Sequence, residues 1–432
     1  MIIMKKSLLL LILFNVSLCV YAQWQPTGIS TNTIEGIYNV ASHNGELFAS
    51  VNTAGFIKST DNGSSWNPVG QTGFVTNENS RRVTHIQSTG TALYVVTFYA
   101  NTASSMIYKS LDNGQTFVPD VTGIPTNSGE IVDVDYFYSH NDYLVAVVNS
   151  GNYIKHVNDA SWQRNNNAST EFSEHFAFYG SKFYAWGSYH LGTSTDNGQT
   201  WTFAGDANLP PYFLANNLTV NPDSGRIYVS GRSLFNYDQK LLYTDNEGVS
   251  WTDIDISSHL SNNWIGVAQS IQELFVKGSY VQFSLDNNGN PSVPDIFVST
   301  DGGVNFTADV LGLPSNSSGT TTAVKFVLHN NNLFMALNFI DIYRKPFSTL
   351  SIDKVTQSLD VLIYPNPSNG IFNFKFNSPI KQIQVFNVQG TLIQSIESNM
   401  SMESIKIDEK GIYFVKIINA NIHATIKKVI RN

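Results

Sequence analysis

Short apolar runs separated by polar turns extend over most of the chain. Between residues 23 and 347 these runs are rich in β-branched and aromatic residues, as in Gly55-Phe56-Ile57-Lys58. Such runs predict β-strands, because an amphipathic helix needs a longer stretch with a period near 3.6 residues. From residue 361 onwards the pattern becomes a strict alternation, as in the three Phe residues between 372 and 376. The sequence therefore predicts an all-β protein with two regions of strands.

One eight-residue motif recurs between the strands of the first region, with a Ser or Thr, an Asp, a Gly and a final aromatic residue. Its Asp can accept hydrogen bonds from the N–H groups of a tight turn, and its Gly allows a left-handed backbone. A fifth copy, residues 244–251, has one extra residue between Asp245 and Gly248. The other four copies are Ser59-Thr60-Asp61-Asn62-Gly63-Ser64-Ser65-Trp66, Ser110-Leu111-Asp112-Asn113-Gly114-Gln115-Thr116-Phe117, Ser194-Thr195-Asp196-Asn197-Gly198-Gln199-Thr200-Trp201 and Ser299-Thr300-Asp301-Gly302-Gly303-Val304-Asn305-Phe306.

The spacing of the motif predicts the blades of a propeller. Successive aromatic residues lie 51, 84, 50 and 55 residues apart, and periods of 40 to 50 residues are typical of propeller blades. The interval of 84 residues is too long for one blade. Within it, Asp159-Ala160-Ser161-Trp162 has the Trp of the motif without its Asp and Gly at the usual offsets.

The first residues of the region predict how the ring closes. Trp24-Gln25-Pro26-Thr27-Gly28 is similar to the segment after a turn, Trp66-Asn67-Pro68-Val69-Gly70. At the other end, residues 323–328, 333–338 and 341–345 form three predicted strands with no motif after them. The Trp24 strand can complete their sheet and remove an exposed edge. The sequence thus predicts a seven-bladed β-propeller over residues 23–347, closed by an N-terminal strand.

The motif resembles the Asp-box of BNR-repeat, sialidase-like β-propellers. This resemblance implies that the motif residues shape hairpin turns and do not bind ligand. The residues given this structural role are Asp61, Gly63, Trp66, Asp112, Gly114, Phe117, Asp196, Gly198, Trp201, Asp245, Gly248, Trp251, Asp301, Gly303 and Phe306.

The second region predicts a small antiparallel β-sandwich over residues 361–432, after a linker at 348–360. It contains Tyr364-Pro365-Asn366-Pro367, then Gly411-Ile412-Tyr413-Phe414-Val415, and ends near Lys427-Lys428-Val429. These stretches resemble the type A C-terminal sorting domain of the type IX secretion system of Bacteroidetes. The resemblance implies contact with that secretion machinery through residues 361–432, and a secreted or cell-surface location.

The N-terminus has the order of a secretory signal peptide. Lys5 and Lys6 precede an apolar run, and Ala22 ends a small-residue cleavage site that would leave Gln23 first. The apolar run is too short to span a bilayer, so residues 1–22 are predicted to be removed and the mature chain to have no transmembrane segment. Cys19 is the single cysteine, which excludes disulfides and thiolate chemistry from the mature protein.

Charge limits the classes of ligand. Hydrophobic residues make up 42% of the chain and charged residues only 13%, so its polarity comes mainly from uncharged side chains. Residues 353–432 carry a net charge of +3, and residues 23–352 carry −13. An acidic body cannot neutralise a run of phosphates, which excludes nucleic acids and polyanionic glycans. Neutral saccharides, cations and proteins remain as ligands.

Ligands of propellers bind where loops converge on the channel mouth, which in sialidase-like propellers is opposite the Asp-box hairpins. Aromatic rings beside polar groups suit sugar binding, because a ring face stacks on C–H groups while polar neighbours hold hydroxyls. The predicted ligand-binding residues in these loops are Arg81, Arg82, Tyr189, Tyr212 and Trp264.

Catalysis is an alternative. Glu35, Glu130 and Glu174 precede predicted innermost strands and could converge, and glycoside hydrolysis needs two carboxylates about 5–10 Å apart. The Arg-Ile-Pro motif of sialidases is absent, and a triad of arginines cannot be assembled at the mouth. The histidines have no zinc-binding spacing, and the sequence predicts neither a metal nor a cofactor. Our sequence-based hypothesis is a non-catalytic module that binds glycan or protein, with a glycoside hydrolase and a structural or assembly factor as alternatives.

Overall fold

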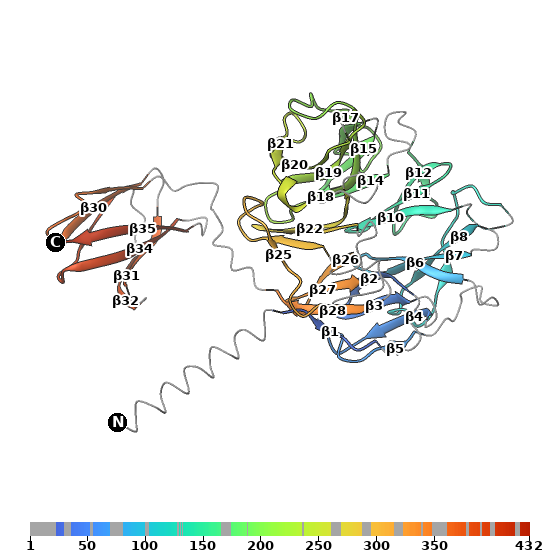
Figure 1. Cartoon of the computed structure of the whole chain (residues 1–432), viewed down its shortest axis with the longest axis horizontal. Helices are drawn as coiled ribbons and strands as arrows, with labels where there is room; N and C mark the ends of the chain where they lie inside the picture. The colour runs from blue at the N-terminus through green and yellow to red at the C-terminus, as the bar shows by residue number, and fades with distance from the viewer. Residues whose placement is uncertain are drawn as a thin grey trace, which may run out of the picture. The chain divides into compact units, whose positions relative to one another are not determined.

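The structure is a computed structural model, and its chain divides into two compact units, Met1–Ser351 and Ile352–Asn432 (Figure 1). The predicted signal peptide, residues 1–22, and the predicted linker, residues 348–360, lie outside the described residues. The described residues are 23–29, 36–51, 55–69, 81–99, 103–127, 129, 131, 133–165, 174–187, 189–235, 237–260, 269–286, 295–314, 323–337, 340–347, 361–376, 380–388, 391–397, 402–419 and 424–432.

Within these residues the first unit contains seven four-stranded antiparallel sheets, which we call blades 1 to 7. Blades 1 to 3 consist of β2 (Ile37–His43), β3 (Glu46–Val51), β4 (Gly55–Ser59) and β5 (Asn67–Pro68); β6 (Arg81–Ser88), β7 (Leu93–Tyr99), β8 (Ser104–Ser110) and β9 (Val118–Pro119); and β10 (Val134–His140), β11 (Tyr143–Val148), β12 (Gly151–His156) and β13 (Gln163–Arg164). Blades 4 and 5 consist of β14 (His175–Tyr179), β15 (Lys182–Gly187), β16 (His190–Ser194) and β17 (Thr202–Phe203); and β18 (Phe213–Val220), β19 (Ile227–Ser233), β20 (Gln239–Thr244) and β21 (Thr252–Ile254). Blade 6 consists of β22 (Ile271–Lys277), β23 (Tyr280–Leu285), β24 (Ile296–Ser299) and β25 (Thr307–Ala308), and a 3-10 turn, Ser257–His259, precedes it.

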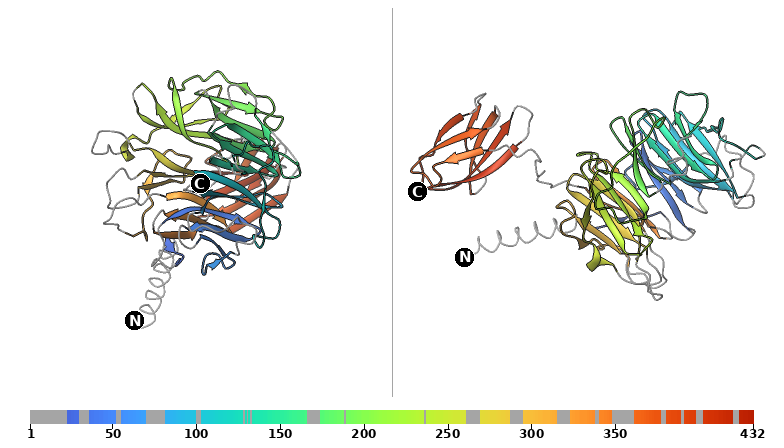
Figure 2. Two further views of the ribbon diagram at one scale, coloured as in Figure 1. Left: turned by 90° about the vertical axis from the view of Figure 1, so that its right-hand side faces the viewer. Right: turned by 90° about the horizontal axis from the view of Figure 1, so that it is seen from above.

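Blade 7 is built from both ends of the unit. Its strands are β26 (Ala323–His329), β27 (Asn332–Leu337), β28 (Asp341–Pro346) and the N-terminal β1 (Gln25–Pro26), which pairs with β28 in the register Gln25 to Arg344. The first strands of successive blades contact one another in the cycle β2, β6, β10, β14, β18, β22, β26 and back to β2. Figure 1 follows this cycle from blue to orange, and Figure 2 shows the blades from two further sides. The prediction of an all-β, seven-bladed propeller closed by an N-terminal strand is confirmed.

Antiparallel pairing divides the loops of the ring between two faces. Each first strand begins on one face, and the connections between second and third strands return to that same face. We call it the mouth face. The repeated motif joins third and fourth strands and therefore lies on the opposite face.

Trp24 anchors the closing strand. Its side chain is only 1% exposed, its backbone N–H donates to the carbonyl of Leu311 at 2.9 Å, and its indole N–H donates to the carbonyl of Asp309 at 3.0 Å. Lys345 forms an ion pair with Asp309 and places its ammonium group 4.5 Å from the centre of the Trp24 ring. The N-terminal segment is thus held against blade 6 as well as blade 7.

Trp162 of blade 3 repeats this arrangement. Its backbone N–H donates to Thr122 at 2.8 Å, its indole N–H donates to the carbonyl of Asp120 at 2.9 Å, and Lys155 forms an ion pair with Asp120. Blades 3 and 7 are the two blades without the repeated motif. In both, a Trp, an Asp of the preceding blade and a Lys tie the outermost strand into the ring.

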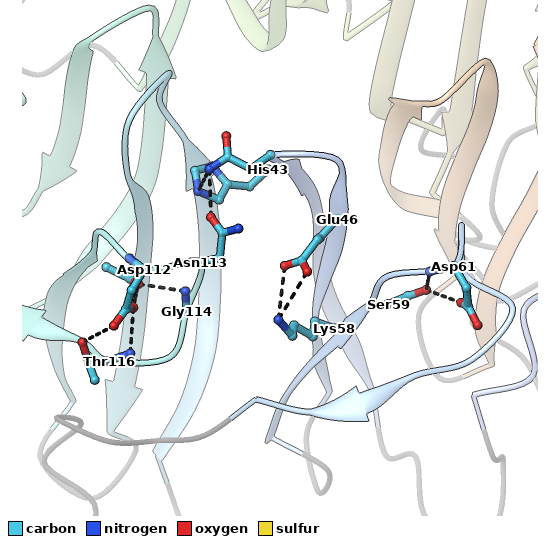
Figure 3. Close-up of polar contacts among 11 residues, drawn as sticks. His43, Glu46, Lys58, Ser59, Asp61, Asp112, Asn113, Gly114 and Thr116 are labelled. Atoms are coloured by element: carbon cyan, nitrogen blue, oxygen red, sulfur yellow. Dashed lines mark hydrogen bonds and ion pairs between the residues drawn. The ribbon is translucent and has the colours of Figure 1, made fainter.

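The repeated motif folds as a tight turn with closely similar hydrogen bonds in the five blades that contain it, and Figure 3 shows some of these bonds for blades 1 and 2. In blade 1 the Ser59 hydroxyl donates to Asp61 at 2.8 Å and accepts the N–H of Gly63 at 2.8 Å. The same oxygen of Asp61, Oδ1, accepts the backbone N–H of Ser65 at 2.8 Å, and the other oxygen accepts the Ser65 hydroxyl at 2.6 Å. Gly63 has a positive φ of 76°, and a Cβ there would lie 3.0 Å from the ring of Phe334 in the neighbouring blade.

The blade 5 turn corrects the role predicted for Asp245. Asn246, not Asp245, accepts the N–H of Ser250 at 2.9 Å and the hydroxyl of Thr244 at 2.8 Å. Asp245 instead forms a two-point ion pair with Arg226, at 2.7 and 2.8 Å. Thr244 is separated from Gly248 by the same three residues as in the other copies, so this turn has no insertion. The sequence alignment of this copy matched its Asp with the Asp of the other copies. Matching Thr244 with the Ser of the other copies would have placed Asn246 at the Asp position.

Hydrogen bonds hold the pKa of the turn aspartates well below the ordinary value. The pKa is lowered to about 2 in Asp61, Asp112 and Asp196, first because the hydroxyl group four residues later donates to the carboxylate, and then because backbone N–H groups do so. In Asp301 partial burial opposes the shift, but the backbone and side chain of Asn305 outweigh it, and the pKa is again about 2.

We expect the propeller to lose stability in acid between pH 4 and pH 2. A carboxyl group with a lowered pKa in the folded state stabilises it above the unfolded pKa of about 3.9, and that contribution disappears as pH falls to 2. Replacing Asp61, Asp112, Asp196 and Asp301 together by Asn should flatten this dependence with little effect at pH 7, because Asn246 in blade 5 accepts the equivalent backbone N–H and donates from its amide to the Ser250 hydroxyl. Urea midpoints measured from pH 7 to pH 2 test this. An equally steep acid loss in the variant would contradict it.

The second unit is a two-layer β-sandwich, as predicted for the tail. One sheet has the order β29 (Val361–Tyr364), β30 (Ile371–Phe376), β33 (Met402–Lys406), and the other has the order β32 (Leu392–Glu397), β31 (Ile380–Asn387), β34 (Gly411–Asn419), β35 (Ala424–Arg431). Their alternating apolar residues form one core: Phe372, Phe374, Ile383, Val385, Ile405, Val415, Ile417 and Val429.

Candidate ligand-binding face

The sequence-predicted site residues fall into three groups. Glu174, Tyr189 and Tyr212 lie on the mouth face, directly before β14, β16 and β18. Arg81 and Arg82 begin the innermost strand β6, and only the backbone of Arg81 is described. The positions of Glu35, Glu130 and Trp264 lie outside the described residues.

Side chains near the mouth face link the first strands of neighbouring blades through hydrogen bonds. In six of the seven blades the first strand contains a β-bulge near its start. Side chains near the start of first strands, in blade 4 without a bulge as in the others, reach the neighbouring blade. His175 contacts the carbonyl of Ala215 at 3.0 Å, and Asn217 donates to the carbonyl of Ile271 at 3.0 Å. Burial lowers the pKa of His175 to about 4, so this ring is neutral at pH 7. We assign it to the scaffold.

A cavity of about 380 Å³ opens beside blades 3 and 4 and is lined by Asp135, Tyr136 and Glu174. Burial raises the pKa of Asp135, and the nearby charge of Asp133 raises it further. The Tyr136 ring packs edge-on against His175, with centroids 5.3 Å apart. The structure therefore places Glu174 beside a carboxylate that the sequence did not single out. Asp135 is the extra residue of the bulge between Val134 and Tyr136, and strand alternation cannot predict where such a residue points.

Arg82 lies on β6 of blade 2 and contacts aromatic rings of blades 1 and 2. Its guanidinium group is 5.0 Å from the centre of the Tyr38 ring and 5.2 Å from that of Phe98. It also donates to the hydroxyl of Tyr38 at 3.3 Å. Two aromatic rings from neighbouring blades thus hold this cation in place.

Exposed aromatic side chains gather on the mouth face of blades 4 and 5. Tyr212 is 55% exposed, Phe235 69% and Tyr237 57%. The ring of Tyr212 packs edge-on between Tyr189 at 5.4 Å and Phe235 at 5.2 Å. Two leucines, each 36% exposed, belong to the same loops and strand ends. We call the set the rim patch; it consists of Tyr189, Tyr212, Leu214, Leu234, Phe235 and Tyr237.

The backbone of the rim patch is in an unusual conformation. Tyr189, Tyr212 and Tyr237 have positive φ angles of 70°, 50° and 59°, and the left-handed region costs a residue other than Gly of order 1–3 kcal/mol. Local hydrogen bonds hold this geometry: Leu234 N–H to Tyr212 at 3.2 Å and Tyr237 N–H to Ser233 at 3.0 Å. The fold therefore fixes the loops that present these tyrosines.

The sequence singled out Tyr189 and Tyr212 as candidate ligand-binding residues, but it did not single out Phe235 and Leu234, which join them in the rim patch. The contact between Tyr212 and this loop joins residues more than 20 positions apart, and it depends on the pairing of β18 with β19. The sequence signal that could have indicated them is the apolar pair Leu234-Phe235 in the predicted loop between two strands.

Comparisons with known proteins agree with the two-part architecture. Residues 362–432 match the family of secretion system C-terminal sorting domains. No curated protein matches the chain in sequence. Among the described residues, no helix has the length and apolar character needed to cross a membrane.

Solved structures similar to this chain are β-propellers. YCF48 from Cyanidioschyzon merolae has a TM-score of 0.53 at 13% identity, covering 76% of this chain and 99% of that one. The structure of YCF48 bound to D1 peptide gives 0.52 at 14% identity, with 77% and 97% covered. The GH74 xyloglucanase from Xanthomonas campestris gives 0.54 at 13% identity, with 83% and 60% covered. At these identities the likeness concerns the fold alone. The chain therefore consists of a β-propeller followed by a type IX secretion system sorting domain, which marks it as a surface or secreted protein of Bacteroidetes.

Proposed function

We propose that the exported propeller is a non-catalytic binding module and that it contacts its ligand, a protein or a glycan, through the rim patch. The observation that carries the proposal is the exposure of Tyr212, Phe235 and Tyr237 together on one face. Contiguous exposed apolar patches are uncommon in soluble monomers and mark binding sites. The left-handed tyrosines support the proposal, because costly backbone conformations concentrate at functional sites.

Glycoside hydrolysis is a second candidate, supported by the cavity with Asp135 and Glu174. The raised pKa of Asp135 suits a proton donor, and Glu174 places a second carboxyl group beside it. The described residues that line this cavity are Asp135, Tyr136 and Glu174, and none of them belongs to the rim patch. Structures similar to this chain include a propeller bound to a peptide and a xyloglucanase. The fold therefore does not decide between a binding module and a hydrolase. An assembly factor, the remaining alternative, would be a case of protein binding by the same surface.

The proposal predicts that ligand binding depends on the rim patch. The full chain is screened on an array of neutral glycans and against a displayed library of random peptides. Phe235→Ser and Tyr212→Ser should each weaken binding of any ligand found by about 30-fold, since a central aromatic contact is worth roughly 2 kcal/mol. Phe203, which is 40% exposed on the outer strand of blade 4, provides the matched control, and Phe203→Ser should bind as the parent does.

Hydrolysis gives the opposing result. Turnover of aryl glycosides by the full chain, lost in both Glu174→Gln and Asp135→Asn, would contradict a non-catalytic module. Binding that is indifferent to Phe235→Ser would contradict the assignment of the surface.

A further inference from the structure

We infer that the partner of the rim patch is a protein segment with a large apolar or aromatic side chain next to a carboxylate. The inference rests on the proposed function and narrows its ligand from two classes to one. It follows from the ring geometry, the composition and the charges of the patch.

The rings of the rim patch do not form a common platform. Tyr189 meets Tyr212 at an interplanar angle of 76°, and Tyr212 meets Phe235 at 79°. Neighbouring rings at right angles cannot present their faces together to consecutive sugar units. They leave ring faces and edges pointing in different directions, between which a single bulky side chain can insert. This arrangement fits an anchor residue of a protein better than a flat saccharide chain.

The composition of the rim patch also favours a protein. Leu214 and Leu234 add aliphatic surface that cannot hydrogen bond to hydroxyl groups. Protein interfaces are enriched in Tyr, Phe and Arg at their centres. Two acidic residues lie in these loops: Asp206 is engaged in an ion pair with His190, and Asp238 directly follows Tyr237.

Arg232 places a positive charge beside the rim patch, and a negatively charged group on the partner would complement it. It pairs with Leu214 in the register of β18 and β19, and its guanidinium group lies 5.6 Å from the centre of the Tyr237 ring. The nearby Lys240 is already bonded to Asp253 at 2.7 Å. Arg232 is thus a cation embedded in the apolar surface, and a carboxylate beside the anchor can form charge-assisted hydrogen bonds with it.

A displayed library of random peptides, selected on the full chain, tests the inference. The expected result is enrichment of peptides with an aromatic or large aliphatic residue close to Asp or Glu. Phe235→Ser should weaken their binding at least 10-fold, whereas Phe203→Ser should not change it. Arg232→Glu should shift the selected peptides from acidic to basic, an outcome that a purely structural role of Arg232 would not produce. Unchanged urea midpoints establish that the variants are folded.

Other outcomes overturn the inference. Neutral oligosaccharides that bind the parent and not Phe235→Ser, with no peptides selected, would overturn the partner class and leave the proposed function standing. A dimer in sedimentation velocity that Phe235→Ser dissociates would assign the patch to a second copy of the chain. Finding neither peptides nor glycans that depend on the patch would overturn the inference and the proposed function together.

Discussion

Trp24→Ala is expected to destabilise the propeller by about 3–5 kcal/mol and to release its N-terminal segment. The cost is that of removing a buried Trp side chain, here one that is 1% exposed. The variant also loses the indole hydrogen bond to Asp309 and the contact with Lys345. Because β1 is only two residues long, its attachment also depends on the residues beside it: Trp24 before it, and Thr27 after it, whose N–H donates to the carbonyl of Ile342 at 2.9 Å. Urea unfolding measures the cost, and limited proteolysis measures the release of residues 23–29.

Trp162→Ala is the matched control. Trp162 has the same indole hydrogen bond and the same neighbouring Lys–Asp ion pair, but chain continues on both sides of it within the ring. The two variants should lose similar free energies of unfolding, and only Trp24→Ala should expose a chain end to protease. Equal protection of residues 23–29 in Trp24→Ala and in the parent would contradict the proposed anchoring.

Gly312→Ala should have the second large effect. Gly312 has a positive φ of 89°, and an added methyl group would overlap the backbone carbonyl of Trp24. Gly302→Ala separates the two causes, because Gly302 has a similar φ of 80° but nothing within 4 Å of an added Cβ. We expect Gly302→Ala to cost about 1–2 kcal/mol from the left-handed backbone, and Gly312→Ala to cost roughly 1–3 kcal/mol more from the overlap.

Thermal or urea unfolding of the two glycine variants decides this prediction. Gly123→Ala should behave like Gly312→Ala, since its methyl group would meet the backbone of Trp162 in the same way. Equal losses in Gly302→Ala and Gly312→Ala would mean that the backbone of Trp24 can move away, and that the closing segment is not packed as tightly as described.

The blade count was predictable because a turn that needs a particular hydrogen-bond pattern leaves a repeating signature. The sequence matched Trp24 and Trp162 to the final aromatic residue of the repeated motif. Both lie in blades without the motif turn, where contacts among a Trp, an Asp and a Lys hold the outermost strand instead. The identity of the bonded residue was less predictable. Asn246 accepts the backbone N–H of Ser250 and the hydroxyl of Thr244 as an Asp would. A match by residue type therefore selected Asp245, whose carboxylate faces Arg226.

The candidate sites were predictable only in part because they join residues from different strands. Topology placed Glu174, Tyr189 and Tyr212 on the mouth face, since alternate strand ends share a face. Asp135 could not be placed, because it is the extra residue of a β-bulge. Phe235 meets Tyr212 through the pairing of two strands, and that register is a property of the folded sheet.

The closed ring decides which loops share the mouth face, and an engineered disulfide tests it most directly. Gln25 and Arg344 are paired across β1 and β28, and such pairs have Cα atoms about 4.5–5.5 Å apart, within reach of a disulfide. Cys19 is the single natural cysteine, and Cys19→Ser leaves only the engineered pair. Mild oxidation of Gln25→Cys/Arg344→Cys should cross-link the chain nearly completely, while Gln25→Cys/Arg164→Cys should remain reduced. No cross-link in the first pair, or equal cross-linking in both, would contradict the closure of the ring.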